Sequence, residues 1–210
     1  MTSRLASLRA RPRKPGEASF FWFEAQFGCE AVKVMPGEYF VDDDASLLIM
    51  TTLGSCIATC LWDRRARVGG LNHFMLPEGA GDDDEAPEIA GRYGLFAMEL
   101  LVNELLKRGA SRATLEAKVF GGGQVVAGLA SQDIGERNTR FVLDYLQTER
   151  IAVVSSDVRG IHARKVCFLP ATGKALVRRL APARAAALVA DERRAALRVL
   201  PSAAGSVDLF

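Results

Sequence analysis

One cysteine and one histidine in this chain have the residue types and the spacing that covalent catalysis requires. Cys56 ends the small-residue turn Leu53-Gly54-Ser55-Cys56, and His73 lies in the segment Gly69-Gly70-Leu71-Asn72-His73-Phe74-Met75-Leu76-Pro77. The chain has only 2 histidines in 210 residues, and this one falls within a hairpin's length of a cysteine. A free thiol, with a pKa near ~8.5, needs a base to become a nucleophile at neutral pH. Cys56 and His73 are therefore a candidate nucleophile and base.

Such a pair supports acyl chemistry on an amide. The thiolate attacks the carbonyl carbon, His73 donates a proton to the departing ammonia or amine, and water hydrolyses the thioester. Backbone amides around Gly54, Ser55 and Cys56 are the candidate donors to the oxyanion, since small residues let a substrate approach the main chain. Gly54, Ser55 and Asn72 are predicted to form the oxyanion or substrate loop. A third group that orients the histidine is expected, and the polar side chains nearby in the sequence are Thr51, Thr52, Ser55 and Asn72.

Each of these residues also has a purely structural interpretation. A free cysteine in an apolar run is commonly a small buried hydrophobe, and we expect this for Cys60 and Cys167. His73 could be a hydrogen-bonded residue beside Asn72. Cys56, Cys60 and His73 could be zinc ligands, but the two cysteines fall on one predicted strand and no fourth ligand is nearby. No metal is expected.

Composition and charge favour a globular protein of the cytoplasm. The apolar fraction of 49% and charged fraction of 25% are ordinary for a folded domain, and no apolar run approaches the length of a membrane span. The four cysteines show no CxxC spacing, which favours a reducing compartment. A basic arm of five residues before position 15 and the acidic run Asp82-Asp83-Asp84-Glu85 are expected to be solvated. The arm has no interleaved aromatic residues, so nucleic-acid binding is not expected.

The order of predicted elements indicates one α/β domain. Residues 1–19 are predicted to be an irregular basic leader, residues 20–180 the folded domain, and residues 181–210 an Ala/Arg-rich extension with a surface helix and a loose tail. Inside the domain, apolar spacing from Tyr93 to Leu105 predicts a helix that stops at Gly109, and a second helix is expected from near Asn138. Short apolar runs predict strands at 47–50, 57–62, 115–120, 151–154, 165–169 and 175–177. The fold class is therefore a single-domain α/β sandwich with mixed β-sheet layers and two main helices.

Three further segments have local interpretations. Gly121-Gly122-Gly123 follows a predicted strand and lacks the lysine of a phosphate-binding loop, so we expect it to allow close backbone approach beside the site. Ile134-Gly135-Glu136-Arg137-Asn138 is predicted to be a loop that caps the second helix. Pro170-Ala171-Thr172-Gly173 is predicted to be a hairpin turn, and His162 a surface loop residue.

Seven short motifs in order along the chain resemble the CheD family of chemoreceptor glutamine deamidases. The likeness covers about residues 33 to 180, and it rests on the following blocks: Pro36-Gly37-Glu38-Tyr39, Leu53-Gly54-Ser55-Cys56, Gly69 to Pro77, Arg92-Tyr93-Gly94, Ala117 to Gly122, Ile134 to Asn138 and Pro170 to Gly173.

The resemblance implies a cofactor-free protein-glutamine glutaminase that converts receptor glutamines to glutamates. It implies that Cys56 is the nucleophile, that His73 is its base, and that an upstream threonine, for which we take Thr51, assists. It also implies methyl-accepting chemotaxis proteins as substrates and a CheC-type phosphatase as a possible partner. Two alternatives stay open: a cysteine hydrolase with another amide or ester substrate, and a non-catalytic module that binds receptor or phosphatase.

Overall fold

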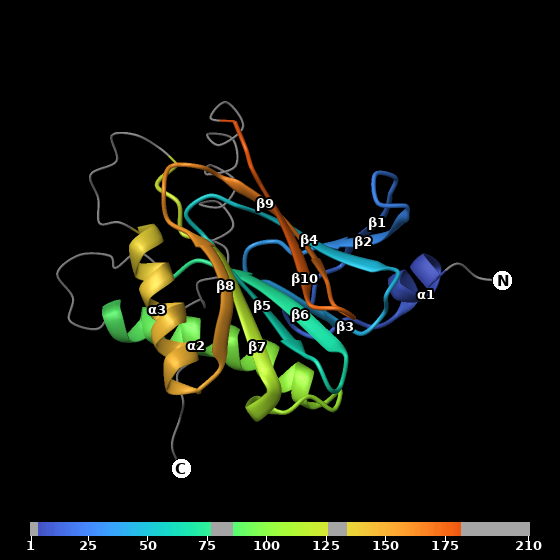
Figure 1. Ribbon diagram of the computed structural model, residues 1–210, viewed down its shortest axis with the longest axis horizontal. Helices are drawn as coiled ribbons and strands as arrows, with labels where there is room; N and C mark the ends of the chain where they lie inside the picture. Colours follow the sequence, from blue (N-terminus) through green and yellow to red (C-terminus); the bar gives the residue numbers. More distant parts are fainter. Residues whose placement is uncertain (1–3, 77–85, 126–133, 182–210) are drawn as a thin grey trace, which may run out of the picture.

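Three layers make up the molecule, as a computed structural model that describes residues 4–76, 86–125 and 134–181 shows. An outer sheet packs face to face on a central sheet, and two helices cover the other face of the central sheet (Figure 1). The outer sheet has the strand order β1-β2-β4-β9-β10, and the central sheet has the order β3-β6-β5-β7-β8. Each sheet has one parallel pair, β2 with β4 and β7 with β8, among antiparallel neighbours. The predicted α/β sandwich with mixed sheets and two main helices is therefore confirmed.

Ten short strands and three α-helices lie within the described residues. The outer sheet consists of β1 (Phe20–Glu24), β2 (Cys29–Lys33), β4 (Leu47–Leu53), β9 (Arg164–Leu169) and β10 (Lys174–Arg179). The central sheet consists of β3 (Glu38–Asp42), β5 (Ile57–Asp63), β6 (Val68–Phe74), β7 (Leu115–Gly121) and β8 (Ala152–Val158). The helices are α1 (Arg4–Ala10), α2 (Ala86–Leu106), α3 (Ile134–Thr148) and the single 3-10 turn η1 (Arg112–Thr114).

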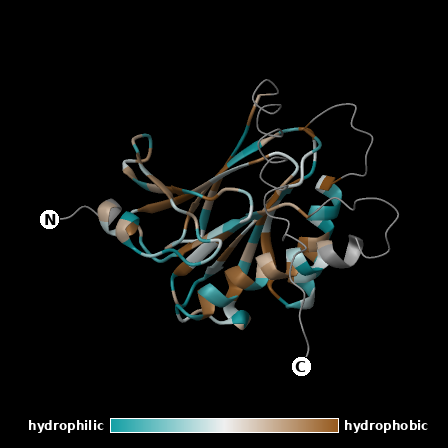
Figure 2. Ribbon diagram, turned by 180° about the vertical axis from the view of Figure 1, so that it is seen from behind, coloured by the Kyte–Doolittle hydropathy of each residue, from teal (hydrophilic) through white to brown (hydrophobic). Residues whose placement is uncertain are grey.

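Side-chain alternation along the strands separates two cores. On β4, Leu47, Ile49 and Leu53 face the central sheet and join the core between the sheets, while Leu48 and Met50 belong to a small cluster on the outside of the outer sheet. Figure 2 shows the hydrophobic colour concentrated along the strands in the middle of the molecule. The core between the sheets thus holds β4 in one register, because a one-residue slip would expose its inward side chains.

The two helices bury apolar stripes on the central sheet. Helix α3 turns Val142, Tyr145 and Leu146 inward, and α2 turns Met98, Leu101 and Leu105 inward. Within residues 4–76, 86–125 and 134–181, none of the helices has the length and apolar content that crossing a bilayer requires.

The leader differs from its predicted irregular form. Residues 4–10 form the helix α1, and Leu8 is buried in the core between the sheets. Arg9 donates to the carbonyl oxygen of Phe21 at 2.7 Å, and the Arg13 guanidinium lies 4.6 Å from the centre of the Phe21 ring. Two arginines of the arm thus contact β1 of the folded domain.

Several other local predictions can be compared with the structure. The second helix begins at Ile134, so the predicted capping loop at 134–138 is wrong and is instead the first turn of α3. Phe96 belongs to the predicted apolar stripe of α2 but is 64% exposed. The strands predicted at 47–50, 57–62, 115–120, 151–154, 165–169 and 175–177 are confirmed as β4, β5, β7, β8, β9 and β10, each with bounds that differ by a few residues, and the turn predicted at 170–173 joins β9 to β10. The acidic run at 82–85 and the predicted helix and tail after residue 181 lie outside the described residues.

Candidate functional site

The hairpin of β5 and β6 places Cys56 and His73 on one face of the central sheet. Cys56 immediately precedes β5, and Ala58 of β5 lies opposite His73 of β6. Because side chains alternate, Cys56 points to the same side as Ala58, and both belong to the core between the sheets. Cys56 and His73 are thus diagonal neighbours across an antiparallel pair, and the backbones of such neighbours are typically roughly 7–8 Å apart, within reach of an aromatic side chain such as an imidazole.

Thr51 reaches His73 from the opposing sheet. It lies on the inward face of β4, and its Oγ1 is 2.8 Å from His73 Nδ1 and 2.8 Å from the carbonyl oxygen of Val34. The Val34 carbonyl only accepts, so the Thr51 hydroxyl donates to it and in turn accepts from Nδ1–H. Val34 O, at 3.3 Å from Nδ1, favours the same tautomer. This donor and acceptor count puts the ring proton on Nδ1 and leaves Nε2 as the basic nitrogen.

Burial keeps His73 neutral. Only 2% of its surface is exposed, and desolvation lowers its pKa to about 4. The backbone hydrogen bond to Val34 works in the opposite direction, and the positive charge of Lys33 adds to the lowering. At neutral pH the imidazole therefore carries no charge and is able to accept a proton.

Cys56 is buried, with 0% exposed surface. Tyr93 of α2, expected to be a core position, has its pKa raised to about 12, first by burial and then by the nearby Cys56. A glutamine side chain reaches the thiol only after neighbouring side chains move.

The turn that carries Cys56 is anchored through its carbonyl groups. Gly54 O accepts from Gly123 N at 2.8 Å, and Cys56 O accepts from Gly122 N at 2.7 Å. Gly121 has φ +112°, and a Cβ built there would lie 2.2 Å from Cys56 O. The prediction that the three glycines allow close backbone approach beside the site is confirmed.

Asn138 joins the two halves of the site and was missed as a functional residue. Its Nδ2 donates to Ser55 O at 2.9 Å, and its Oδ1 accepts from Leu76 N at 2.9 Å. Ser55 precedes the cysteine, and Leu76 follows the strand that carries His73. Asn138 is 0% exposed. The available signal was an amide residue on the inward stripe of α3, where apolar residues are the rule.

Asn72, predicted to lie in the oxyanion or substrate loop, is placed elsewhere. Its Oδ1 accepts from Thr59 N at 3.0 Å, and its Nδ2 donates to Ala97 O at 3.1 Å, on the face covered by α2. Strand alternation puts it opposite to its neighbour His73, so Asn72 ties α2 to the central sheet. Ser55, the other predicted loop side chain, contacts Met75 Sδ at 3.7 Å through its Oγ.

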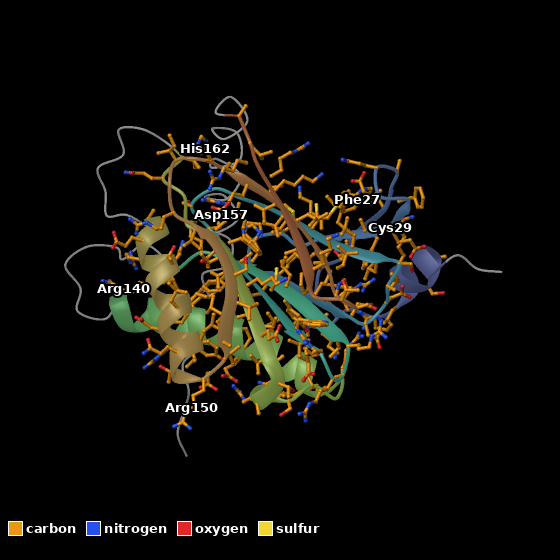
Figure 3. The ribbon with its side chains drawn as sticks, in the orientation of Figure 1. Phe27, Cys29, Arg140, Arg150, Asp157 and His162 are labelled. Carbon is orange, nitrogen blue, oxygen red and sulfur yellow. The ribbon has the colours of Figure 1, made fainter. Side chains whose placement is uncertain are left out.

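The remaining candidate ligands are dispersed. Cys60 and Cys167 are buried as predicted, and burial raises the pKa of both thiols. In the part of the chain that the structure describes, no three His, Cys, Asp or Glu side chains are grouped as metal ligands. His162 is half-buried in the connection from β8 to β9, near Asp157 at one end of the sheets (Figure 3).

Comparison with known proteins identifies the family. The model of the family described as CheD chemotactic sensory transduction matches residues 75–179. A relative from Albidiferax ferrireducens, "Probable chemoreceptor glutamine deamidase CheD 1", is 57% identical over 99% of this chain and 87% of its own length. One from Thiobacillus denitrificans, "Probable chemoreceptor glutamine deamidase CheD", is 47% identical over 92% of this chain and 96% of its own.

Among solved structures, a Neisseria meningitidis protein of the DUF152 family model overlaps 58% of this chain and 51% of its own, at 14% identity and a TM-score of 0.33. That likeness is too partial to support an argument. The sequence relatives extend over nearly the full chain at high identity, and on their evidence this chain belongs to the CheD family.

Proposed function

We propose that this protein is a protein-glutamine deamidase that converts glutamines of methyl-accepting chemoreceptors to glutamates and releases ammonia. The names of the relatives, chemoreceptor glutamine deamidases, support the substrate class. The observation that carries the chemistry is the Thr51–His73 contact of 2.8 Å, which directs the basic nitrogen away from Thr51 on the face shared with Cys56. The roles of nucleophile, base and orienting residue are therefore assigned to Cys56, His73 and Thr51.

The first step is attack on the amide. The Cys56 sulfur bonds to the carboxamide carbon while His73 Nε2 takes the thiol proton. A base with a pKa of about 4 is too weak to hold this proton before attack, so proton transfer accompanies bond formation. The backbone amides of Gly54, Ser55 and Cys56 are the proposed donors to the oxyanion that forms.

The second half releases the products. His73 returns its proton to the leaving nitrogen, ammonia departs, and a thioester remains on Cys56. Water then adds to the thioester with His73 as base, which yields glutamate and restores the thiol. The sum is glutamine plus water to glutamate plus ammonia, and no cofactor takes part.

The compartment and partners belong to the same proposal. We place the protein in the cytoplasm, since none of the four cysteines, all of which the structure describes, forms a disulfide, as a reducing compartment favours. A CheC-type phosphatase is a proposed partner.

The burial of Cys56 favours a second candidate function. A thiol with 0% exposed surface fits a purely structural cysteine, such as a non-catalytic module that binds receptor or phosphatase would contain. Mass spectrometry of a purified receptor cytoplasmic fragment, incubated with the wild type and with Cys56→Ala and His73→Ala, separates the two. Glutamine-to-glutamate conversion by the wild type alone supports the deamidase, and receptor binding without conversion by any of the three supports the module.

A further inference from the structure

A groove with three basic side chains lies on the outside of the outer sheet, away from the core. It encloses about 280 Å³, and its lining includes Trp22, Lys33, Thr52, Lys165, Arg178 and Leu180. We call it the basic groove. Its volume is at the lower end of the range for small-molecule pockets, which suits one or two side chains of a peptide better than a cofactor.

Strand register explains why these side chains meet. Lys165 of β9 lies opposite Thr52 of β4 on one side and Arg178 of β10 on the other, so all three share a face. Lys33 of β2 lies opposite Met50, which belongs to the outer cluster, and so it points to that face too. The three cations thus come from β2, β9 and β10, with Thr52 of β4 between Lys33 and Lys165.

Lys165 and Arg178 form a directly opposed pair of like charges, which destabilises a sheet. The adjacent pair of the same two strands, Arg164 and Arg179, shows how the fold neutralises such a pair: Asp157 lies 2.8 Å from Arg164 and 3.3 Å from Arg179. No described side chain forms an ion pair with Lys165 or Arg178, nor with Lys33. The repulsion between Lys165 and Arg178 is therefore not reduced by a carboxylate, whereas Asp157 reduces the repulsion between Arg164 and Arg179.

Apolar surface borders these charges. Trp22 forms part of the wall, and nearby on the same sheet Phe20 is 60% exposed and Leu176 is 38% exposed. Glu24, on the same face of β1 as Trp22, accepts from the indole Nε1 at 3.3 Å, which orients the ring. Exposed aromatic and apolar groups beside unpaired cations are typical of protein-binding surfaces.

We propose that the basic groove binds an acidic segment of a protein partner, with carboxylates between Lys33, Lys165 and Arg178 and an apolar side chain against Trp22. The opposed cations and the adjacent apolar wall are complementary to such a segment in charge and in polarity.

The basic groove lies directly behind the candidate catalytic site and shares Thr51 of β4 with it. Thr51, which borders the groove, contacts His73 through its Oγ1, while Thr52 turns its side chain outward into the groove. Lys33 precedes Val34, whose carbonyl oxygen accepts from Thr51. A partner seated in the groove therefore contacts the strands that orient His73 without covering Cys56.

The test measures binding and does not depend on deamidation. The probe is a fluorescein-labelled peptide of glutamate, alanine and leucine, and its control has glutamine at every glutamate position. We expect the acidic peptide alone to raise the anisotropy with the full chain, and Lys165→Gln/Arg178→Gln to weaken this binding at least about tenfold. Arg140→Gln/Arg150→Gln removes the same charge from two exposed residues on the side of the molecule away from Cys29 of β2, and we expect it to bind as the wild type does (Figure 3).

Thermal unfolding separates a binding role from a structural one. Because the groove variant removes a like-charge pair, its midpoint temperature should equal or exceed that of the wild type. Absence of acidic-peptide binding, an equal loss in both double variants, or a destabilised groove variant would overturn the proposal. So would inorganic phosphate that displaces the peptide at equal concentration, since the site would then take small anions.

Discussion

Replacing Asn138 with aspartate tests whether this residue joins the two halves of the site. In the wild type the amide donates to Ser55 O and accepts from Leu76 N, each at 2.9 Å, with no solvent exposure. In Asn138→Asp one oxygen still accepts from Leu76. The other faces the Ser55 carbonyl, so it makes a hydrogen bond only when protonated. The variant should therefore be nearly native at low pH and destabilised at high pH.

The size of the effect follows from the burial. A carboxyl group with an unfolded pKa near ~3.9 is raised by up to 3–5 units when fully buried. If we take about 3 units, the folded pKa is near ~7, and at about 1.4 kcal/mol per unit the variant loses about 4 kcal/mol above that pH. The unfolded state gives up its proton first, so the added instability grows as pH rises from about 4 to about 7. Below this window the loss is about 1 kcal/mol, one hydrogen bond of changed geometry.

The assay is urea unfolding near pH 5 and near pH 8. At each pH the free energy of unfolding of the wild type is subtracted from that of the variant. Asn103→Asp is the matched control, because Asn103 is an exposed residue of α2, and we expect little difference at either pH. The rate of deamidation by the Asn138→Asp variant should decrease as the pH is raised from about 5 to about 8. An equal loss at both pH values, or none at either, would show that Asn138 does not bridge Ser55 and Leu76.

Three further outcomes are expected. Thr51→Val should lower kcat about 10- to 30-fold with KM unchanged, because it removes one buried hydrogen bond of about 1.4–2 kcal/mol. Thr51→Ser keeps the hydroxyl and should keep the rate. Equal rates in the two variants would refute the orienting role. The folded pKa of His73, about 4, lies below its unfolded value near 6.5, so the unfolded state takes up a proton first as pH falls. About 3 kcal/mol of stability should be lost between about pH 6.5 and pH 4, and calorimetry of His73→Gln should show this slope removed. Gly121→Ala places a Cβ 2.2 Å from Cys56 O and should abolish activity or folding. Gly109→Ala, at φ +92° with no atom within 4 Å, should cost only backbone strain, and equal midpoints of the two glycine variants would contradict the close packing.

The placement of Cys56 and His73 on one face could be predicted from sequence because Cys56 begins, and His73 lies within, the same hairpin of β5 and β6. Local patterns determine such neighbours: a small-residue turn, alternating apolar positions, and a second glycine-marked segment. The two main helices could also be predicted, because the spacing of their apolar residues is a local pattern. The start of α3 was predicted near Asn138, four residues late, and the capping loop predicted at 134–138 included Gly135. In the structure it is the residue that permits contact with Gly122, since an added Cβ would lie 2.3 Å from Gly122 O.

Contacts made across the sandwich were beyond sequence reasoning. Thr51 was one of several nearby polar residues, and only the packing of β4 over β6 brings its hydroxyl to His73 while turning Asn72 to the helix side. Asn138 lies 83 residues from Ser55, and nothing local indicates that they meet. The arginines of the leader were predicted to be solvated for the same reason. Nothing in the local sequence indicates that Arg9 and Arg13 contact Phe21 of β1.

The burial of the site and the low pKa of His73 have one physical origin, and together they constrain how catalysis begins. A thiolate and an imidazolium in a site with almost no exposed surface would need their charges compensated, and desolvation instead favours the neutral thiol and neutral imidazole. A substrate that displaces the covering side chains brings a polar amide to the thiol at the moment when the oxyanion donors come into use. Cys56 should therefore stay unreactive toward small alkylating agents until a protein substrate binds, which would confine the nucleophile to glutamines presented by a docked surface.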